Sequence, residues 1–188
     1  MGLDQYLTKR TYVKNWKHDE KDGVSKWKVS AKKYGKKSNI KPERISHVIE
    51  EITTWRKANA IHRWFVENVQ DGNDDCGEYV VDREQLSELR DLCLEVIQKA
   101  EVKEGVVQNG STFSGGEWTP NFESGEMIMN AEEISEILPT ANGFFFGSTD
   151  YDQWYMMDIR NTYEVLRDEL NEEKDNGWEV DYFYSSSW

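Results

Sequence analysis

Residues 143–155 place three consecutive aromatic side chains directly before a segment with the character of a helix. The aromatics at 144–146 are typical of a short strand that is buried on both faces, and Gly147 permits a tight turn after it. Ser148 or Thr149 then stands where a helix cap is expected. The segment therefore predicts a strand that leads straight into a helix, and it restricts the chain to folds that contain both elements.

Two interpretations of this junction stay open. The first amides of a helix carry partial positive charge, so an exposed helix start is suited to hold a phosphate or a nucleotide. Asp150 and Asp152 follow at once, however, and their carboxylates would satisfy the same amides without any ligand. The sequence predicts either a self-capped helix start or an anion site.

Length and composition predict one compact domain over residues 1–188. A chain of 188 residues is long enough to bury a sizeable core, and aromatic residues make up 13% of it, with eight Trp. Rings that exceed the needs of one core often line pockets or interfaces, so we also expect self-association. No apolar stretch approaches the about 20 residues that cross a bilayer, and the first residues lack a secretion signal, which predicts a cytoplasmic protein.

Charge is distributed unevenly along the chain. Residues 1–44 carry thirteen Lys and Arg against five Asp and Glu, a balance of +8, whereas residues 45–188 carry ten against thirty-one, a balance of −21. The two parts give the net charge of −13. Because the acidic part repels phosphates, we expect no direct binding of nucleic acid, and we expect the basic part to form a hairpin at 1–44 that folds against the acidic body or is solvated.

Hydrophobic periodicity and turn residues divide the chain into strands and helices. Expected strands cover residues 5–13, 26–31, 44–53, 78–81 and 179–184, and the first two are expected to pair. Expected helices cover residues 55–69, 82–100, 130–139 and 150–174. The segment of about 101–125 is rich in Gly, Ser and Thr and is expected to be a flexible loop. This order predicts an α+β domain in which about three main helices pack on an antiparallel or mixed sheet.

His62 is the candidate binding residue with the most distinctive position. It lies on the apolar face of the helix expected at 55–69, and a buried imidazole needs partners for its ring nitrogens. Two interpretations remain, a core histidine bonded to the protein and a pocket-lining donor that recognises a ligand. General-base catalysis would need further groups that no motif supplies, so we expect no enzymatic activity.

No metal or cofactor site is expected. Asp71, Asn73 and Asp75 match the first ligand positions of a calcium loop, but Cys76 occupies the position that requires glycine. The two cysteines, Cys76 and Cys93, are not spaced as zinc ligands. The acidic loop is therefore expected to be a plain turn into the next strand.

Several segments together resemble a family of small bacteriophage proteins. These are the opening Met-Gly-Leu-Asp-Gln-Tyr-Leu, the run Trp-Arg-Lys-Ala-Asn-Ala-Ile-His-Arg-Trp-Phe-Val at 55–66, Asp-Asp-Cys-Gly-Glu-Tyr at 74–79 and Phe-Phe-Phe-Gly-Ser-Thr at 144–149. The resemblance brings no chemistry, cofactor or catalytic residue. It implies a role in the cytoplasm of the host cell, against host defence, either by binding a host protein or by sequestering a defence signal.

Two functions of different classes follow as expectations. The first is a binding protein that sequesters a small nucleotide-like signal of the ADP-ribose class in an aromatic pocket, with rings gripping the base and amides or cations holding phosphate. The second is an acidic interaction protein that blocks a host factor, as a mimic of nucleic acid. The residues expected to bind the ligand are Trp55, Arg56, Asn59, His62, Trp64, Gly147, Ser148, Thr149, Tyr151, Trp154 and Tyr155.

Overall fold

The computed structural model describes residues 2–16, 18, 21, 23–143, 146–171 and 179–188. A four-stranded sheet is built from β1 (Asp4–Tyr12), β4 (His47–Arg56), β5 (Glu78–Val81) and β8 (Val180–Ser187). The helices are α1 (Asn59–Asn68), α2 (Arg83–Lys99), α3 (Ala131–Ile137) and α4 (Gln153–Asn171), with a 3-10 turn, η2, at Pro42–Arg44. Two separate hairpins consist of β2 (Lys32–Lys33) with β3 (Lys36–Lys37), and of β6 (Val102–Ser114) with β7 (Glu117–Ile128).

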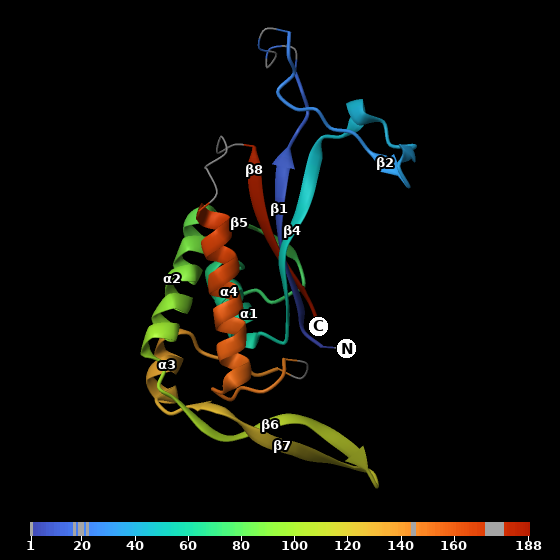
Figure 1. Cartoon of the computed structure of the whole chain (residues 1–188). Coiled ribbons are helices and arrows are strands. Elements are labelled where there is room, and N and C mark those ends of the chain that lie inside the picture. The colour runs from blue at the N-terminus through green and yellow to red at the C-terminus, as the bar shows by residue number, and fades with distance from the viewer. Residues whose placement is uncertain (1, 17, 19–20, 22, 144–145, 172–178) are drawn as a thin grey trace.

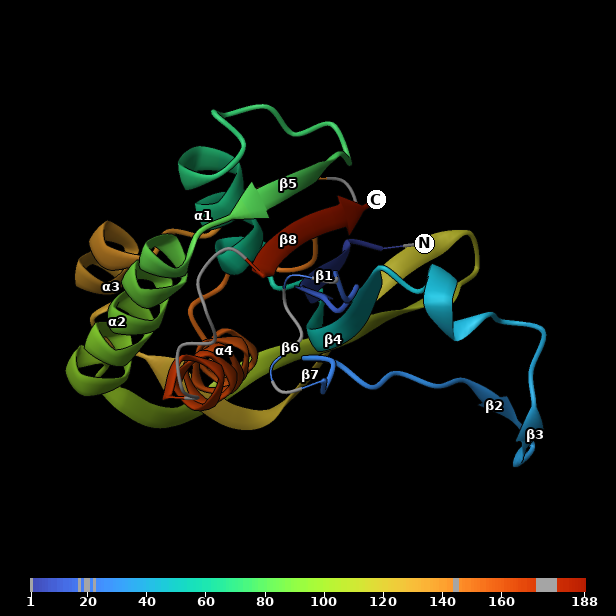
Figure 2. The same cartoon turned by 90° about the horizontal axis from the view of Figure 1, so that it is seen from above.

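The expected α+β class is confirmed. The strand order in the main sheet is β4-β1-β8-β5, and each neighbouring pair is antiparallel. The helices gather on one side of this sheet, while the β6–β7 hairpin extends along one end of the body (Figures 1 and 2). The sheet is therefore a platform with one face covered by helices.

The covered face of the sheet carries the core side chains. Leu7 on β1 and Tyr182 and Tyr184 on β8 are buried, while their sequence neighbours are more exposed because successive side chains of a strand point to opposite faces. On the open face, Ile49 and Val80 are each 61% exposed. Tyr184 stacks on Phe65 of α1 at 3.8 Å between ring centroids, which joins the sheet to the helical layer.

Helix α2 begins where the sequence predicts. Asp82 accepts a hydrogen bond from the Gln85 amide at 2.8 Å, and the Gln85 side chain accepts one from the Asp82 amide at 3.0 Å. This reciprocal capping box satisfies two donors that a helix start leaves free. Leu86, Leu89 and Cys93 are fully buried, as the helical stripe predicts.

A buried ion pair links α4 to the sheet. Lys9 Nζ on β1 lies 3.0 Å from Glu169 Oε1 on α4, and both side chains are largely buried. The Tyr182 hydroxyl donates to the same carboxylate oxygen at 2.6 Å, and Arg83 Nη2 donates to the Leu170 carbonyl at 2.5 Å. Burial is the main reason that the pKa of Tyr182 is raised, and the hydrogen bond to Glu169 adds to the shift.

The expected loop at 101–125 is wrong, because this segment forms most of the β6–β7 hairpin. The turn is made by Gly115 and Gly116, both with positive φ, which suits a tight hairpin connection. Most side chains of both strands are exposed. The alternation of buried and exposed residues that normally reveals a strand is therefore missing.

The expected hairpin between residues 5–13 and 26–31 is also wrong. No strand forms at 26–31, and β1 pairs instead with β4 and β8. The expected strand at 44–53 is present but continues to Arg56, so the expected helix at 55–69 begins only at Asn59. The strand expected at 144–146 lies mostly outside the described residues.

Trp64, which the sequence analysis placed among the candidate ligand-binding residues, is buried. Its ring contacts Phe65 edge-on at 5.1 Å between centroids, and it lines a second hollow together with Leu92 and Ile137. Helix α1 is thus covered on more than one side. Among the described residues, none of the helices combines the length and the apolar character that crossing a membrane requires.

Candidate ligand-binding cleft

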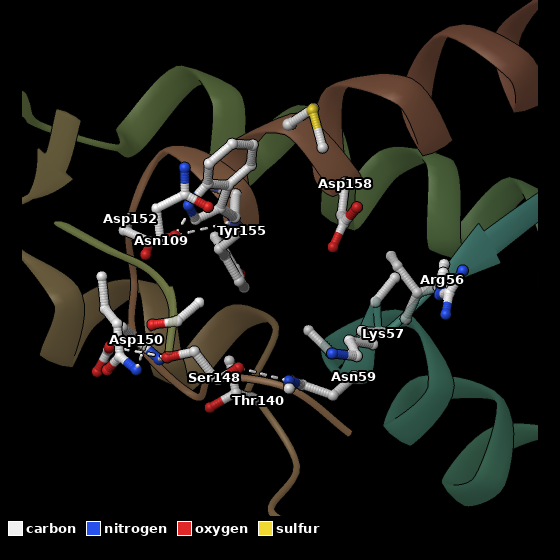
Figure 3. Close-up of a pocket in the computed structure, with 18 of the residues that line it drawn as sticks. Arg56, Lys57, Asn59, Asn109, Thr140, Ser148, Asp150, Asp152, Tyr155 and Asp158 are labelled. Atoms are coloured by element: carbon white, nitrogen blue, oxygen red, sulfur yellow. Dashed lines mark hydrogen bonds between the residues drawn. The ribbon is translucent and has the colours of Figure 1, made fainter. Parts of the chain in front are cut away.

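A cleft of about 770 Å³ opens between α4, the β4–α1 junction, the turn at Gly147 and the β6–β7 hairpin. Figure 3 shows its polar side chains converging from several elements on one space. Six of the eleven residues expected to bind a ligand line it, namely Arg56, Asn59, Gly147, Ser148, Trp154 and Tyr155. The sequence therefore identified the walls formed by α4 and α1 but not the wall formed by the hairpin.

The β4–α1 junction contributes two cations. Lys57 has φ of +63°, a left-handed conformation that is uncommon for a residue with a side chain. Its amide donates to the Leu3 carbonyl at 2.8 Å, and its carbonyl accepts from the Asn59 amide at 2.8 Å, so the backbone is held on both sides. The neighbouring Arg56 side chain is 71% exposed and lies 3.8 Å from an Asp4 oxygen. Both cationic side chains line the cleft (Figure 3).

Asn59 fixes the opposite loop and has no polar atom left for a ligand. Its amide nitrogen donates to the carbonyls of Phe146 at 3.1 Å and Ser148 at 2.6 Å, and its oxygen accepts from the Ala141 amide at 3.2 Å. The side chain is buried. Asn59 therefore positions the turn that carries Gly147, and it does so from the start of α1.

Gly147 is required by its backbone conformation. It has φ of +88°, and an added Cβ would come within 3.2 Å of the Lys57 Cβ. This close approach brings the turn against the β4–α1 junction. Two walls of the cleft, which come from segments ninety positions apart in the sequence, are packed against each other here.

The cap of α4 differs from the one expected. Asp152 Oδ1 accepts hydrogen bonds from the amides of Trp154 at 2.8 Å and Tyr155 at 3.2 Å, so Asp152 caps the helix in place of Ser148 or Thr149. Ser148 Oγ instead accepts from the Asp150 amide at 3.1 Å. Two of the amides at the helix start already bind a carboxylate, so of the two open interpretations the self-capped one describes this junction.

Asp158 is one of the cleft residues that sequence reasoning missed. It lies one turn after Tyr155 on α4 and projects toward the space beside Lys57 (Figure 3). Its carboxylate has no hydrogen-bond or ion-pair partner within the described part of the chain. Burial, reinforced by the charge of Asp152, raises the pKa of Asp158 to about 7. Burial also raises the pKa of Asp152, against the lowering effect of the two amides that it caps.

Aromatic rings reach the cleft from α4 and from the hairpin. Trp154 is 39% exposed, and Trp118 on β7 is 70% exposed. Tyr155 is buried and donates its hydroxyl to the Leu138 carbonyl at 2.8 Å, so it forms part of the floor. The hairpin also contributes residues 108–111. The sequence signal for this wall was the Gly-Gly turn, which marks two flanking strands.

Five expected binding residues have other roles. Trp55 is buried and donates to Thr162 Oγ1 at 2.8 Å. Thr149 and Tyr151 are both bonded to Thr140, through the Thr149 carbonyl and the Tyr151 hydroxyl. Trp64 belongs to the helical layer, as described above. His62 lies on α1 and faces Tyr184 of the sheet. None of the five lines the cleft.

His62 is a core histidine. It is 1% exposed, its Nδ1 lies 2.8 Å from the Tyr184 hydroxyl, and its Nε2 lies 3.1 Å from Asp74 Oδ2. Tyr184 donates onward to Gln5 Oε1 at 3.1 Å. Both ring nitrogens thus have protein partners, as the structural interpretation requires.

The loop at 71–77 is organised by its own hydrogen bonds. Asp75 Oδ1 accepts from the Gly77 amide at 2.8 Å and from the Tyr79 hydroxyl at 3.0 Å, and these bonds lower the pKa of Asp75. In the described part of the chain, no group of three or more His, Cys, Asp or Glu side chains is placed to hold a metal ion. Comparisons with protein families, curated proteins and solved structures found no match.

Proposed function

We propose that the cleft binds a small nucleoside phosphate of the ADP-ribose class and that the protein sequesters this ligand, as a counter-defence protein of the phage type would. One observation carries the proposal. The same cleft combines exposed indole rings, two cations and the Asp158 carboxylate around a volume of about 770 Å³. This volume lies within the range of about 300–1,000 Å³ that small-molecule sites occupy.

Each part of such a ligand has a counterpart in the cleft. Trp154 and Trp118 offer ring faces on which a base can stack. Arg56 and Lys57 offer positive charge to phosphate. Asp158 offers an acceptor of the kind that binds ribose hydroxyl groups in nucleotide sites. The rings lie on the hairpin and at the start of α4. The cations lie at the β4–α1 junction, and the Asp158 carboxylate lies on α4 (Figure 3).

The charges of the cleft limit the number of phosphates. Among the described residues that line it, Asp150, Asp152 and Asp158 stand beside two cations. A nucleoside triphosphate would bring about four negative charges into this acidic surrounding and would be repelled. One or two phosphates, with a ribose that donates hydrogen bonds to carboxylates, fit the charges better. We therefore expect ADP-ribose to bind more tightly than ATP.

Isothermal titration calorimetry with ADP-ribose, AMP and ATP tests the proposal. We expect Lys57→Gln to weaken ADP-ribose binding about tenfold, as expected for one charge-assisted bond, and Trp154→Ala to weaken it about fivefold or more. Matched controls are Lys99→Gln on α2 and Trp188→Ala immediately after β8, which change the same residue types outside the cleft. Both controls should bind like the wild type.

Two results would count against the nucleotide cleft. No heat of binding and no rise in melting temperature with any of the three nucleotides at millimolar concentration would refute the nucleotide cleft. Co-purification of a basic host protein in its place, released by high salt, would favour the acidic interaction protein.

A further inference from the structure

The segment 23–46 is a basic arm that projects from the open end of the sheet. It carries eight Lys and Arg and a single acidic residue, Glu43. Both views show its β2–β3 hairpin well away from helices α1–α4 (Figures 1 and 2), and none of its residues lines the cleft. The tip of the arm is therefore a surface apart from the acidic body, and its sign of charge is opposite to that of the body.

The tip of this arm concentrates like charges. In the two-residue ladder, Lys32 is paired with Lys37 and Lys33 with Lys36, and all four side chains are exposed. Like charges directly opposite each other destabilise a hairpin. Within the described residues, none of these four lysines forms an ion pair. The tip thus contains four cations that repel one another and that only a polyanion would bring together favourably.

The turn between these lysines also carries a residue other than the one that its backbone geometry prefers. Tyr34 has φ of +49° and Gly35 has φ of +74°, which corresponds to a two-residue turn that prefers Asn-Gly. A bulky residue with positive φ is strained. Tyr34 is nevertheless 93% exposed, so its ring gains nothing from packing in return. Lys33 Nζ lies 5.9 Å from the ring centroid, which keeps a cation beside the aromatic face.

The tip departs twice from what stabilises a hairpin, through its paired like charges and through the positive φ of Tyr34. Departures of this kind, with no compensating gain in stability, are expected at functional sites. An exposed ring flanked by paired lysines is the combination by which proteins hold single-stranded nucleic acid, because any base can stack on the ring while the cations contact the flanking phosphates. An acidic protein surface would use the lysines but not the strained tyrosine. We propose that the Lys32–Lys37 tip binds single-stranded nucleic acid, with a base stacked on Tyr34.

This inference is independent of the proposed function of the cleft, and it departs from the expectation that the chain avoids nucleic acid. That expectation followed from the net charge of −13. The fold separates the two signs of charge, and screening over about 8 Å at physiological salt weakens repulsion by the distant acidic surface.

Fluorescence anisotropy of the full chain with labelled oligo-dT of about 16 nucleotides, the upper range of single-strand site sizes, tests the proposal. We expect Tyr34→Ala to weaken binding about fivefold or more, as the loss of one stacking platform does. Tyr34→Asn is the sharper variant. It places the preferred residue in the turn, so it should stabilise the hairpin and still lose the stacking contribution, whereas Tyr34→Phe should bind like the wild type.

The lysines are tested by salt dependence between about 50 and about 200 mM. Lys33→Gln with Lys36→Gln should reduce the slope of log affinity against log salt by about 1.4, which is about 0.7 for each phosphate of a single strand that is no longer neutralised. The matched control, Lys99→Gln with Lys103→Gln, makes the same change in net charge on the body and should leave the slope unchanged. Trp154→Ala should also leave it unchanged, which separates this surface from the cleft.

Three outcomes would overturn the proposal. These are no binding of the oligonucleotide at low salt, equal losses for the two double variants, and unaltered affinity in Tyr34→Asn. Salt-sensitive self-association that is abolished in Lys33→Gln with Lys36→Gln, without oligonucleotide binding, would assign the tip to the acidic face of a second copy.

Discussion

Replacing Asp158 by Asn should stabilise the protein at alkaline pH. Burial raises the pKa of this carboxyl to about 7, whereas an unfolded chain returns it to about 3.9. The folded state therefore binds more protons than the unfolded state between about pH 4 and pH 7, and stability falls as the pH rises through this window. Asn is neutral at every pH and avoids the cost of burying a charge.

The magnitude follows from the size of the shift. About three pKa units at about 1.4 kcal/mol each set an upper limit near 4 kcal/mol above pH 7. Because the side chain is only partly buried and solvent screens it, we expect a gain of about 1–2 kcal/mol at pH 8. At pH 4 the wild-type carboxyl is largely protonated in the folded state, so the gain should nearly vanish.

Urea denaturation at pH 4, 6 and 8, with the difference between variant and wild type taken at each pH, measures this effect. Taking the difference cancels the titration of all other groups. The control is Asp168→Asn, an exposed position on the same helix, which should change the free energy of unfolding by less than about 0.5 kcal/mol. A variant of Asp158 that is less stable than the wild type at pH 8, or a gain that does not grow with pH, would refute the reasoning.

Four further changes should alter stability. Glu169→Gln should cost about 3 kcal/mol in urea denaturation, because it removes the charge that faces the largely buried Lys9 across the ion pair. His62→Ala should cost about 2–5 kcal/mol, through the removal of two hydrogen bonds and a new cavity, with the calorimetric affinity for ADP-ribose unchanged. Asp82→Ala should cost about 1 kcal/mol, measured in the same way, because the capping box of α2 is removed. Gly147→Ala should lower the melting temperature, since its φ of +88° costs about 1–3 kcal/mol with a side chain present; an unchanged melting temperature would contradict the close packing of this turn.

Features that depend on neighbouring residues in the sequence could be predicted. The capping box of α2 needs only the identities of Asp82 and Gln85, and the buried stripe of α2 repeats at helical spacing. The strand at 78–81 is bounded by a turn on one side and this cap on the other. In each case a short segment determines the structure by itself, so no knowledge of tertiary contacts was required.

Features that depend on distant partners could not be predicted. Trp64 lines a hollow together with Leu92 and Ile137, which lie on two other helices, so its surroundings depend on tertiary packing. Asp158 becomes a cleft residue only because the hairpin and the β4–α1 junction close the space around it. The β6–β7 hairpin itself has too few buried positions to produce an alternating pattern. Hydrophobic periodicity reflects the alternation of buried and exposed side chains. It therefore cannot reveal a strand in which few side chains are buried.

The strand order β4-β1-β8-β5 has a consequence for synthesis. β8 lies between β1 and β5, yet the ribosome produces it after every other strand of the sheet. Until β8 emerges, β5 has no neighbour in the sheet, and β1 exposes a row of unpaired amides and carbonyls along one edge. Before β8 is synthesised, the helices can form while the sheet is still divided, so chaperones that shield strand edges should matter most just before β8 emerges.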